Sequence, residues 1–353
     1  MANIQDNRNA LPIGYRLGDY QIQKVLGDGT FGITYLAQDT QLDTPVAIKE
    51  YLPNELAVRE GDYTVQAKSG KDTDNFDWGL DRFIKEARIL AQFKHPNIVR
   101  VLRFFEKHHT AYIVMEYEQG QSLADLIKDG ETATEDEIMT ILQPLLDGLE
   151  TVHNGGYLHR DIKPGNIYLR ANNIPVLIDF GAARYDVGNR SRSVTAIVTP
   201  GYTPFEQYET KGSQQGAWTD IYALGAVLYK LISGKTPVES PERIGTIMRG
   251  KPDPLTPAVE IGRERYSPHL LESIDWALKV NEDKRPQNVG EWREKLLAIP
   301  VVITVQPQRE YSEAPTKRIT PPRNKGWKPS FVIGGVVAFL FAIMVGGVFS
   351  YPI

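Results

Sequence analysis

The chain carries the sequence His159-Arg160-Asp161-Ile162-Lys163-Pro164-Gly165-Asn166, and Asp179-Phe180-Gly181 follows after a short gap. Together these two stretches supply two carboxylates, an amide and an ammonium group. Transfer of a phosphoryl group needs such a set, because its transition state spreads negative charge and requires both positioning and counter-charge. The alternative is a polar turn rich in salt bridges. The spacing favours a site at which a nucleoside triphosphate, its metal ions and an acceptor hydroxyl meet.

The composition is that of a globular protein with an ample core: of 353 residues, 41% are hydrophobic and 24% are charged. The net charge of −4 does not indicate a nucleic-acid-binding surface, so we expect no nucleic acid partner. The chain has no cysteine, which excludes disulfides and thiolate metal sites. Residues 1–19 are polar and lack the apolar stretch of a signal peptide, and we expect them to form a loosely held arm.

The carboxyl-terminal part has a different character. Residues 331–349 are nineteen consecutive residues without a charge. As a helix they would span roughly 28 Å, close to the hydrocarbon thickness of a bilayer. A buried core helix is the alternative, but such a helix is expected to keep a polar face. We therefore expect one transmembrane helix at 331–349, followed by a short tail at 350–353.

A proline-rich, basic linker at residues 300–330 precedes this span. It contains six basic residues against two acidic ones, a net charge of +4, so residues 1–299 carry −8. Basic residues prefer the cytoplasmic side of a membrane. This predicts a single-pass protein of the cell (inner) membrane whose folded domain is cytoplasmic. The linker either touches anionic membrane lipid or is simply solvated, and its prolines keep it extended. The six basic residues are Arg309, Lys317, Arg318, Arg323, Lys325 and Lys328.

A glycine-rich turn separates two apolar stretches near the start of the folded part. Residues 20–26 alternate as a strand does, Gly27-Asp28-Gly29-Thr30-Phe31-Gly32 follows, and Ile33 begins a second apolar run. A dinucleotide-binding fold would need a helix directly after the glycines, whereas residues 33–36 favour a strand. The pattern predicts a hairpin whose bare backbone can lie over phosphates.

Lys49 follows three apolar residues in another predicted strand, 46–49. A mid-strand lysine is costly without an anionic partner. Glu86 is our candidate partner on the protein side, because residues 80–90 have the apolar stripe of a helix; a solvated surface glutamate is the alternative. Lys49 and Glu86 are 37 residues apart, and the role of the insertion between them, residues 50–75, stays open.

The second half of the folded part is expected to be mainly helical. A capping box from Thr134 to Glu137 predicts the start of a buried helix, which Pro144 should bend. This helix leads to the 159–166 stretch. A short strand predicted at 176–178 directs Asp179 towards the same site.

Taken in order from Gly27 to Arg285, these motifs resemble those of bacterial, eukaryotic-like (Hanks-type) serine/threonine protein kinases. The resemblance implies an α+β, bilobal protein-kinase-like fold. A small, β-rich N-lobe with one main helix would occupy residues 20–117, and a larger, mostly helical C-lobe would occupy residues 118–299.

The resemblance also implies roles for individual residues. Asp161 would be the base or orienting group for the acceptor hydroxyl, and Lys163 would neutralise charge near the γ-phosphate. Lys49 would bind the α- and β-phosphates and pair with Glu86. Asp220 is expected to anchor the backbone of the catalytic loop. The implied cofactors are ATP and Mg²⁺, which Mn²⁺ could replace.

Binding residues follow from the same resemblance. Asn166 and Asp179, both hard oxygen donors, would hold the metal. Met115 would limit the nucleotide pocket, and the adenine would meet backbone between Glu116 and Glu118. The residues expected to bind ATP are Gly27, Asp28, Gly29, Thr30, Phe31, Gly32, Ile33, Ala47, Lys49, Met115, Glu116, Glu118 and Asn166.

The stretch Thr199–Glu206 resembles the end of a kinase activation segment, although the usual Ala-Pro-Glu stands here as Pro204-Phe205-Glu206. Arg285 is the expected buried partner of Glu206. Upstream of this stretch, a phosphorylated hydroxyl could pair with Arg160 and order the loop; a flexible polar loop is the alternative. The candidate phosphorylation sites are Ser191, Ser193 and Thr195.

Three functions are compatible with these motifs. The leading one is a membrane-anchored kinase that transfers the γ-phosphate of ATP to Ser and Thr hydroxyls of protein substrates, with autophosphorylation in trans within a homodimer. The second is a pseudokinase scaffold that binds nucleotide or partners without catalysis. The presence of Lys49, Asp161, Asn166 and Asp179 argues against that scaffold. The third is a small-molecule kinase with a related lobe.

Overall fold

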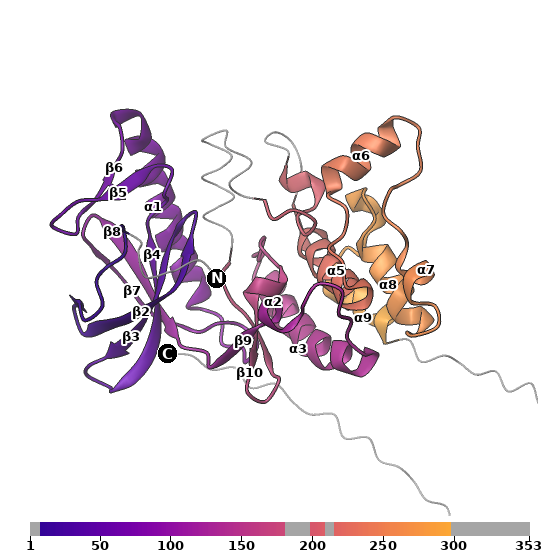
Figure 1. The fold of residues 1–353 in the computed structure, drawn as a ribbon, viewed down its shortest axis with the longest axis horizontal. Helices are drawn as coiled ribbons and strands as arrows, with labels where there is room; N and C mark the ends of the chain where they lie inside the picture. Colours follow the sequence, from indigo (N-terminus) through magenta and orange to yellow (C-terminus); the bar gives the residue numbers. More distant parts are fainter. Residues whose placement is uncertain (1–7, 181–197, 209–214, 298–353) are drawn as a thin grey trace, which may run out of the picture. The chain divides into compact units, whose positions relative to one another are not determined.

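A computed structural model of the chain describes residues 8–180, 198–208 and 215–297 (Figure 1). The predicted division into a β-rich N-lobe and a mostly helical C-lobe is confirmed. The N-lobe is built on a six-stranded antiparallel sheet in the order β1-β2-β3-β4-β8-β7. Its strands are β1 (Arg16–Leu17), β2 (Tyr20–Gly29), β3 (Gly32–Asp39), β4 (Thr44–Tyr51), β7 (Val101–Lys107) and β8 (Thr110–Glu116).

The glycine-rich stretch forms the predicted hairpin between β2 and β3. Gly29 pairs with Gly32, so Thr30 and Phe31 make the turn. The side chains of β3 alternate strictly between the buried core and a half-buried face, as the pleat of a strand requires. Ile33 and Tyr35 therefore point into the core, and Thr34 points to the other face.

The long insertion after Lys49 folds as a small hairpin and an extended helix. Strands β5 (Ala57–Arg59) and β6 (Val65–Ala67) pair with each other, and β6 lies beside α1 (Gly70–Leu90) (Figure 1). The helix buries one apolar face, which includes Phe76 and Phe83. Its early start accounts for the unusual distance between Lys49 and Glu86, because residues 70–79 add more than two turns before the predicted helix.

The prediction of a loose arm over residues 1–19 is wrong for residues 8–19. Leu11 and Leu17 are buried in the core of the N-lobe, and β1 pairs with β2. The backbone N–H of Leu11 donates to the Tyr35 hydroxyl at 3.1 Å. A two-residue strand has no periodic pattern, so sequence reasoning could not find it. Residues 1–7 lie outside the described ranges.

The C-lobe is organised around two helices. The α3 helix (Glu135–Asn154) begins at the predicted capping box, with reciprocal bonds between Thr134 and Glu137. Helix α5 (Ala217–Ser233) is buried along nearly its whole length. Around them lie α2 (Leu123–Leu126), α6 (Ser240–Met248), α7 (Ala258–Gly262), α8 (Pro268–Ala277), α9 (Val289–Leu296), the 3-10 turns η2 (Pro164–Asn166), η4 (Phe205–Gln207) and η5 (Glu282–Lys284), and a sheet of β9 (Gly120–Ser122), β10 (Ile167–Arg170) and β11 (Pro175–Leu177).

The predicted linker at 300–330, transmembrane helix at 331–349 and tail at 350–353 lie outside the described residues. Within the described ranges, no helix combines the length and the apolar character that crossing a bilayer requires.

A buried acid ties the insertion to the sheet. Glu50 is fully buried and forms an ion pair with Arg59 of β5. The same carboxylate accepts hydrogen bonds from the hydroxyls of Tyr35 (2.7 Å) and Tyr112 (2.5 Å). Burial, together with the charge of Glu50, raises the pKa of both tyrosines above the ordinary value, so both stay protonated donors. Every strong polar group of this cluster therefore has a partner.

Replacing Arg59 by Ala is expected to lower the free energy of unfolding by about 3 kcal/mol, because the substitution leaves the Glu50 carboxylate buried without its cation. Thermal and urea unfolding of the two proteins measure this loss. The matched control is Lys85→Ala, which removes the exposed pair with Asp81 (side chains 49% and 54% exposed). This control should leave the midpoint unchanged. Equal losses in the two variants would contradict the role assigned to Arg59.

Candidate active site

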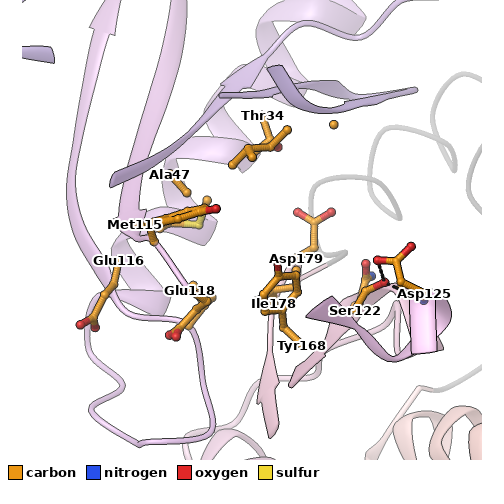
Figure 2. A pocket seen from close by; sticks show the side chains of 16 residues that line it. Thr34, Ala47, Met115, Glu116, Glu118, Ser122, Asp125, Tyr168, Ile178 and Asp179 are labelled. Carbon is orange, nitrogen blue, oxygen red and sulfur yellow. Dashed lines mark hydrogen bonds between the residues drawn. The ribbon is translucent and has the colours of Figure 1, made fainter. Parts of the chain in front are cut away.

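A cavity of about 390 Å³ lies where the N-lobe sheet faces the start of the C-lobe (Figure 2). Thr34 and Ala47 lie on one side of it, and Tyr168 and Ile178 lie on the opposite side. The segment that leaves β8 closes one end. The full lining is Leu26, Gly27, Thr34, Ala47, Val99, Met115, Glu116, Tyr117, Glu118, Ser122, Asp125, Gly165, Asn166, Tyr168, Ile178 and Asp179.

An ion pair joins the two lobes at this cavity. Lys49 of β4 and Asp179, which follows β11, are 130 residues apart in sequence, and Lys49 Nζ lies 2.5 Å from Asp179 Oδ1. The expected anionic partner of the mid-strand lysine is thus present. It is not Glu86, and the predicted Lys49–Glu86 contact is wrong for this structure. Glu86 is buried on α1, but among the described residues Lys49 forms an ion pair with Asp179 only.

The catalytic-loop residues gather around Asp161, which is only 7% exposed. The side-chain amide of Asn166 donates to the backbone carbonyl and to Oδ2 of Asp161, both at 2.8 Å. Lys163 Nζ lies 3.1 Å from Asp161 Oδ1 and 3.3 Å from the Thr199 hydroxyl, and this hydroxyl donates to Asp161 Oδ1 at 3.2 Å. The site therefore holds a carboxylate, an amide and an ammonium group in fixed mutual positions.

Asp220 anchors the backbone of the loop that carries Asp161. Its fully buried carboxylate accepts the backbone N–H groups of His159 and Arg160, each at 2.8 Å, and the ring N–H of His153 at 2.8 Å. These bonds confirm the anchoring role predicted for Asp220. They also hold Arg160 at φ +66°, in the left-handed region that non-glycine residues rarely adopt. The backbone of Asp179 is also in the left-handed region, at φ +65°. Strain of this kind is typical of functional sites.

The His159 ring has one defined tautomer. Its Nε2 donates to the Ile178 carbonyl at 3.1 Å, while Nδ1 accepts the backbone N–H of Asp161 at 3.3 Å. The Phe180 ring lies against it, with centroids 4.3 Å apart. Burial lowers the pKa of His159, and the nearby carboxylate of Asp220 opposes this shift only in part. The imidazole is therefore neutral, as its accepting Nδ1 requires.

The predicted pair of Glu206 and Arg285 is confirmed. Arg285 Nη1 lies 2.7 Å from Glu206 Oε1, and both side chains are buried. The Thr219 hydroxyl donates to the same oxygen at 3.0 Å. The pair supports the start of α5 rather than the cavity. The candidate phosphorylation sites Ser191, Ser193 and Thr195 lie outside the described residues.

The residues predicted to bind ATP divide into two groups. Gly27, Ala47, Met115, Glu116, Glu118 and Asn166 line the cavity, as does the predicted metal ligand Asp179. Asp28, Gly29, Thr30, Phe31 and Gly32 belong to the hairpin tip beyond this lining, and Lys49 reaches the cavity through its pair with Asp179. The expectation for the Ile33 side chain is wrong, because strand alternation turns it into the core.

Sequence reasoning missed several lining residues, Thr34 and Tyr168 among them. The alternation of β3 carried a signal for Thr34, since it is the neighbour of the buried Ile33. No sequence signal marked Tyr168, the second residue of strand β10, which lines the cavity; its hydroxyl donates to the Gly120 carbonyl at 2.9 Å. Arg170, which is not part of the lining, forms a bidentate ion pair with Glu118: its Nε donates to Oε2 at 2.6 Å and its Nη2 to Oε1 at 2.7 Å.

A two-lobed fold with this set of side chains is typical of protein kinases. The protein kinase domain, as a family, matches residues 20–296. The chain therefore belongs to the protein kinase family.

The sequence is 31% identical over 291 residues to the serine/threonine-protein kinase pkn2 of Myxococcus xanthus. The aligned region covers 80% of this chain and 32% of that protein. It is 30% identical over 288 residues to PknB of Mycobacterium tuberculosis, covering 79% and 42%. The chain thus spans only about a third to two fifths of the length of these relatives. A solved structure described as the PpkA-294 apo form matches with a TM-score of 0.73 and 42% identity, covering 82% of this chain and 99% of that one.

Acidification is expected to destabilise the fold through His159. In the unfolded chain its pKa is near the ordinary histidine value of 6.5, and burial lowers it in the folded state. The folded state therefore binds fewer protons, so the stabilising contribution is present above about pH 6.5 and is lost as pH falls below that value. Thermal unfolding at pH 7 and pH 5 measures the effect. In His159→Gln the decrease between these pH values should be smaller; an equal decrease would contradict the assignment.

Proposed function

We propose that this chain is a catalytically active, ATP-dependent serine/threonine protein kinase that transfers the γ-phosphate of ATP to Ser and Thr hydroxyls of proteins. One observation carries the proposal: Lys49 and Asp179 meet at the same cavity that Asn166 lines, and Asn166 in turn is bonded to Asp161. Four residues that a scaffold would not need are assembled with low exposure. The pseudokinase alternative is disfavoured for this reason.

The cavity suits a purine nucleotide. Its walls are largely apolar, and Ala47 and the Tyr168 ring lie on opposite sides of the cavity. Flat aromatic and apolar surfaces of this kind hold a base, and a few polar groups fix its orientation. By analogy with the family, these polar groups are the backbone N–H and C=O between Glu116 and Glu118. Lys49 is placed to exchange the carboxylate of Asp179 for phosphate oxygens.

Asn166 and Asp179 fit a magnesium site. The amide nitrogen of Asn166 is engaged by Asp161, so the oxygen Oδ1 is the end left to a cation. Asp179 contributes a carboxylate on the same cavity wall. Mg²⁺ binds through one or two protein oxygens together with phosphate oxygens and water. A bound Mg²⁺ would neutralise developing charge on the phosphates.

Asp161 is the proposed base or orienting group. In the transfer, the acceptor oxygen forms a bond to the γ-phosphorus, the bond from that phosphorus to the bridging oxygen breaks, and ADP leaves. The hydroxyl proton moves to Asp161. Lys163, 3.0 Å from the Asp161 carboxylate, places a positive charge where the transferred group gathers negative charge.

Two finer parts of the proposal concern regulation and location. Ser191, Ser193 and Thr195 are proposed as autophosphorylation sites, modified in trans within a transient homodimer. The apolar stretch at 331–349 is proposed to span the inner membrane, with the basic linker at 300–330 on the cytoplasmic side near anionic lipid. Its hydropathy, length and flanking charge support this arrangement.

Replacing Asp161 by Ala should reduce phosphate transfer to a generic protein acceptor by about 10³-fold, equivalent to about 4 kcal/mol of barrier. Labelled ATP and purified protein measure the rate. Asp136→Ala, which removes an exposed aspartate at the start of α3, is the control and should keep full activity. Labelling of protein that persists in folded Asp161→Ala would contradict the role of Asp161. Transfer only to small molecules would support a small-molecule kinase, and no transfer by the unmodified chain would favour the pseudokinase.

Deleting residues 331–349 should release the protein from membranes. In bacterial cells, the full chain is expected in the membrane fraction after an alkaline carbonate wash, because a spanning helix resists such washing. The deletion variant is expected in the supernatant with unchanged kinase activity. If the full chain is washed off the membrane, the proposed span is wrong.

A further inference from the structure

The tip of the glycine hairpin is bonded to the insertion that follows Lys49. We call residues 52–67 the brace. The backbone N–H groups of Leu52 and Asn54 donate to the carbonyls of Phe31 (3.1 Å) and Thr30 (3.0 Å). The side-chain amide of Asn54 donates to the Gly29 carbonyl at 3.3 Å. Three consecutive carbonyls of the tip thus accept hydrogen bonds from two residues of the brace, Leu52 and Asn54.

An apolar contact reinforces these bonds. Phe31, at the turn of the hairpin, is only 8% exposed. It forms a small cluster with Leu56 of the brace and the partly buried Trp78 of α1, apart from the main core. An aromatic ring on a two-residue turn would face water if the hairpin stood alone. Leu56 and Trp78 both come from the insertion or from the early turns of α1.

At Gly32 the hairpin lies too close to the end of β4 to leave room for a side chain. A Cβ built on Gly32 would lie 1.9 Å from the Glu50 carbonyl oxygen and 3.3 Å from the Leu52 nitrogen. Backbone atoms cannot move aside as a flexible side chain can. The glycine therefore permits the backbone contact through which the hairpin rests on the strand that leads into the brace.

The brace itself is anchored firmly. Arg59 forms the buried ion pair with Glu50, the residue next to Lys49, and its Nη1 donates to the Tyr63 carbonyl at 2.8 Å. Lys68, just beyond the brace, donates from Nζ to the Asn54 carbonyl at 2.6 Å. The same unit thus connects the hairpin tip to the strand that carries Lys49.

We propose that the brace positions the glycine hairpin over the triphosphate, and that Asn54 and Leu56 are positioning residues for nucleotide binding. The inference rests on the proposed kinase function, in which the hairpin backbone covers the phosphates. A hairpin already held in place loses less conformational freedom when the phosphates bind beneath it. The brace acts through the hairpin and does not itself line the cavity.

The test compares four variants of the full chain. Asn54→Ala and Leu56→Ala are each expected to raise KM for ATP about fivefold, which corresponds to about 1 kcal/mol, and to leave KM for the protein acceptor unchanged. Leu56→Met should keep the KM for ATP of the unmodified protein, because methionine conserves the apolar volume of leucine. Gln66→Ala, an exposed position of β6 in the same brace, is the matched control and should change neither constant.

A binding measurement separates this inference from the proposed function. Calorimetry with AMP-PNP and Mg²⁺, and separately with adenosine, needs no catalysis. Asn54→Ala and Leu56→Ala should bind AMP-PNP about fivefold more weakly and adenosine unchanged. If the unmodified chain transfers no phosphate, the proposed function fails, while this comparison still decides the role of the brace. Unchanged AMP-PNP affinity, an equal loss for adenosine, an equal loss in Gln66→Ala, or a loss that only follows a lower melting temperature would each overturn it.

Discussion

The ion pair between Lys49 and Asp179 is the contact on which the site depends. Its two members come from different lobes and are 130 residues apart in the sequence. A lysine in the middle of a strand needs an anion, and Asp179 supplies it. A charge pair therefore lies at the cavity between the lobes, with Asp179 in the cavity lining.

Buried charges around the site follow one pattern, in which each has a partner of opposite charge or several hydrogen bonds. Asp220 receives two backbone N–H groups and a histidine, Glu206 receives Arg285, and Glu50 receives Arg59 and two tyrosines. Removing one member of such a set leaves an uncompensated buried charge, which is costly. The fold thus fixes the catalytic loop, the activation-segment end and the Lys49 strand with interactions that tolerate little change.

Sequence reasoning succeeded where a chemical requirement leaves a local pattern. The 159–166 stretch, the glycine hairpin, the capping box at Thr134 and the Glu206–Arg285 pair all belong to this group. It failed where tertiary contacts decide. Residues 8–19 are ordered by contacts with the core and by a two-residue strand that pairs with β2. Lys49 pairs with Asp179 instead of Glu86, and Tyr168 lines the cavity. The brace could not be predicted from the sequence either, because its contacts with the hairpin are mainly backbone hydrogen bonds, which leave no pattern of side chains in the sequence.

The most direct test of the central claim is the effect of Mg²⁺ on nucleotide affinity. Calorimetric titration of AMP-PNP with and without Mg²⁺ should be compared in the unmodified protein and in Asp179→Asn. Convergence of Lys49, Asn166 and Asp179 on one metal-bound nucleotide predicts that Mg²⁺ strengthens binding in the unmodified protein and that most of this gain disappears in the variant. A full Mg²⁺-dependent gain in folded Asp179→Asn would contradict the account.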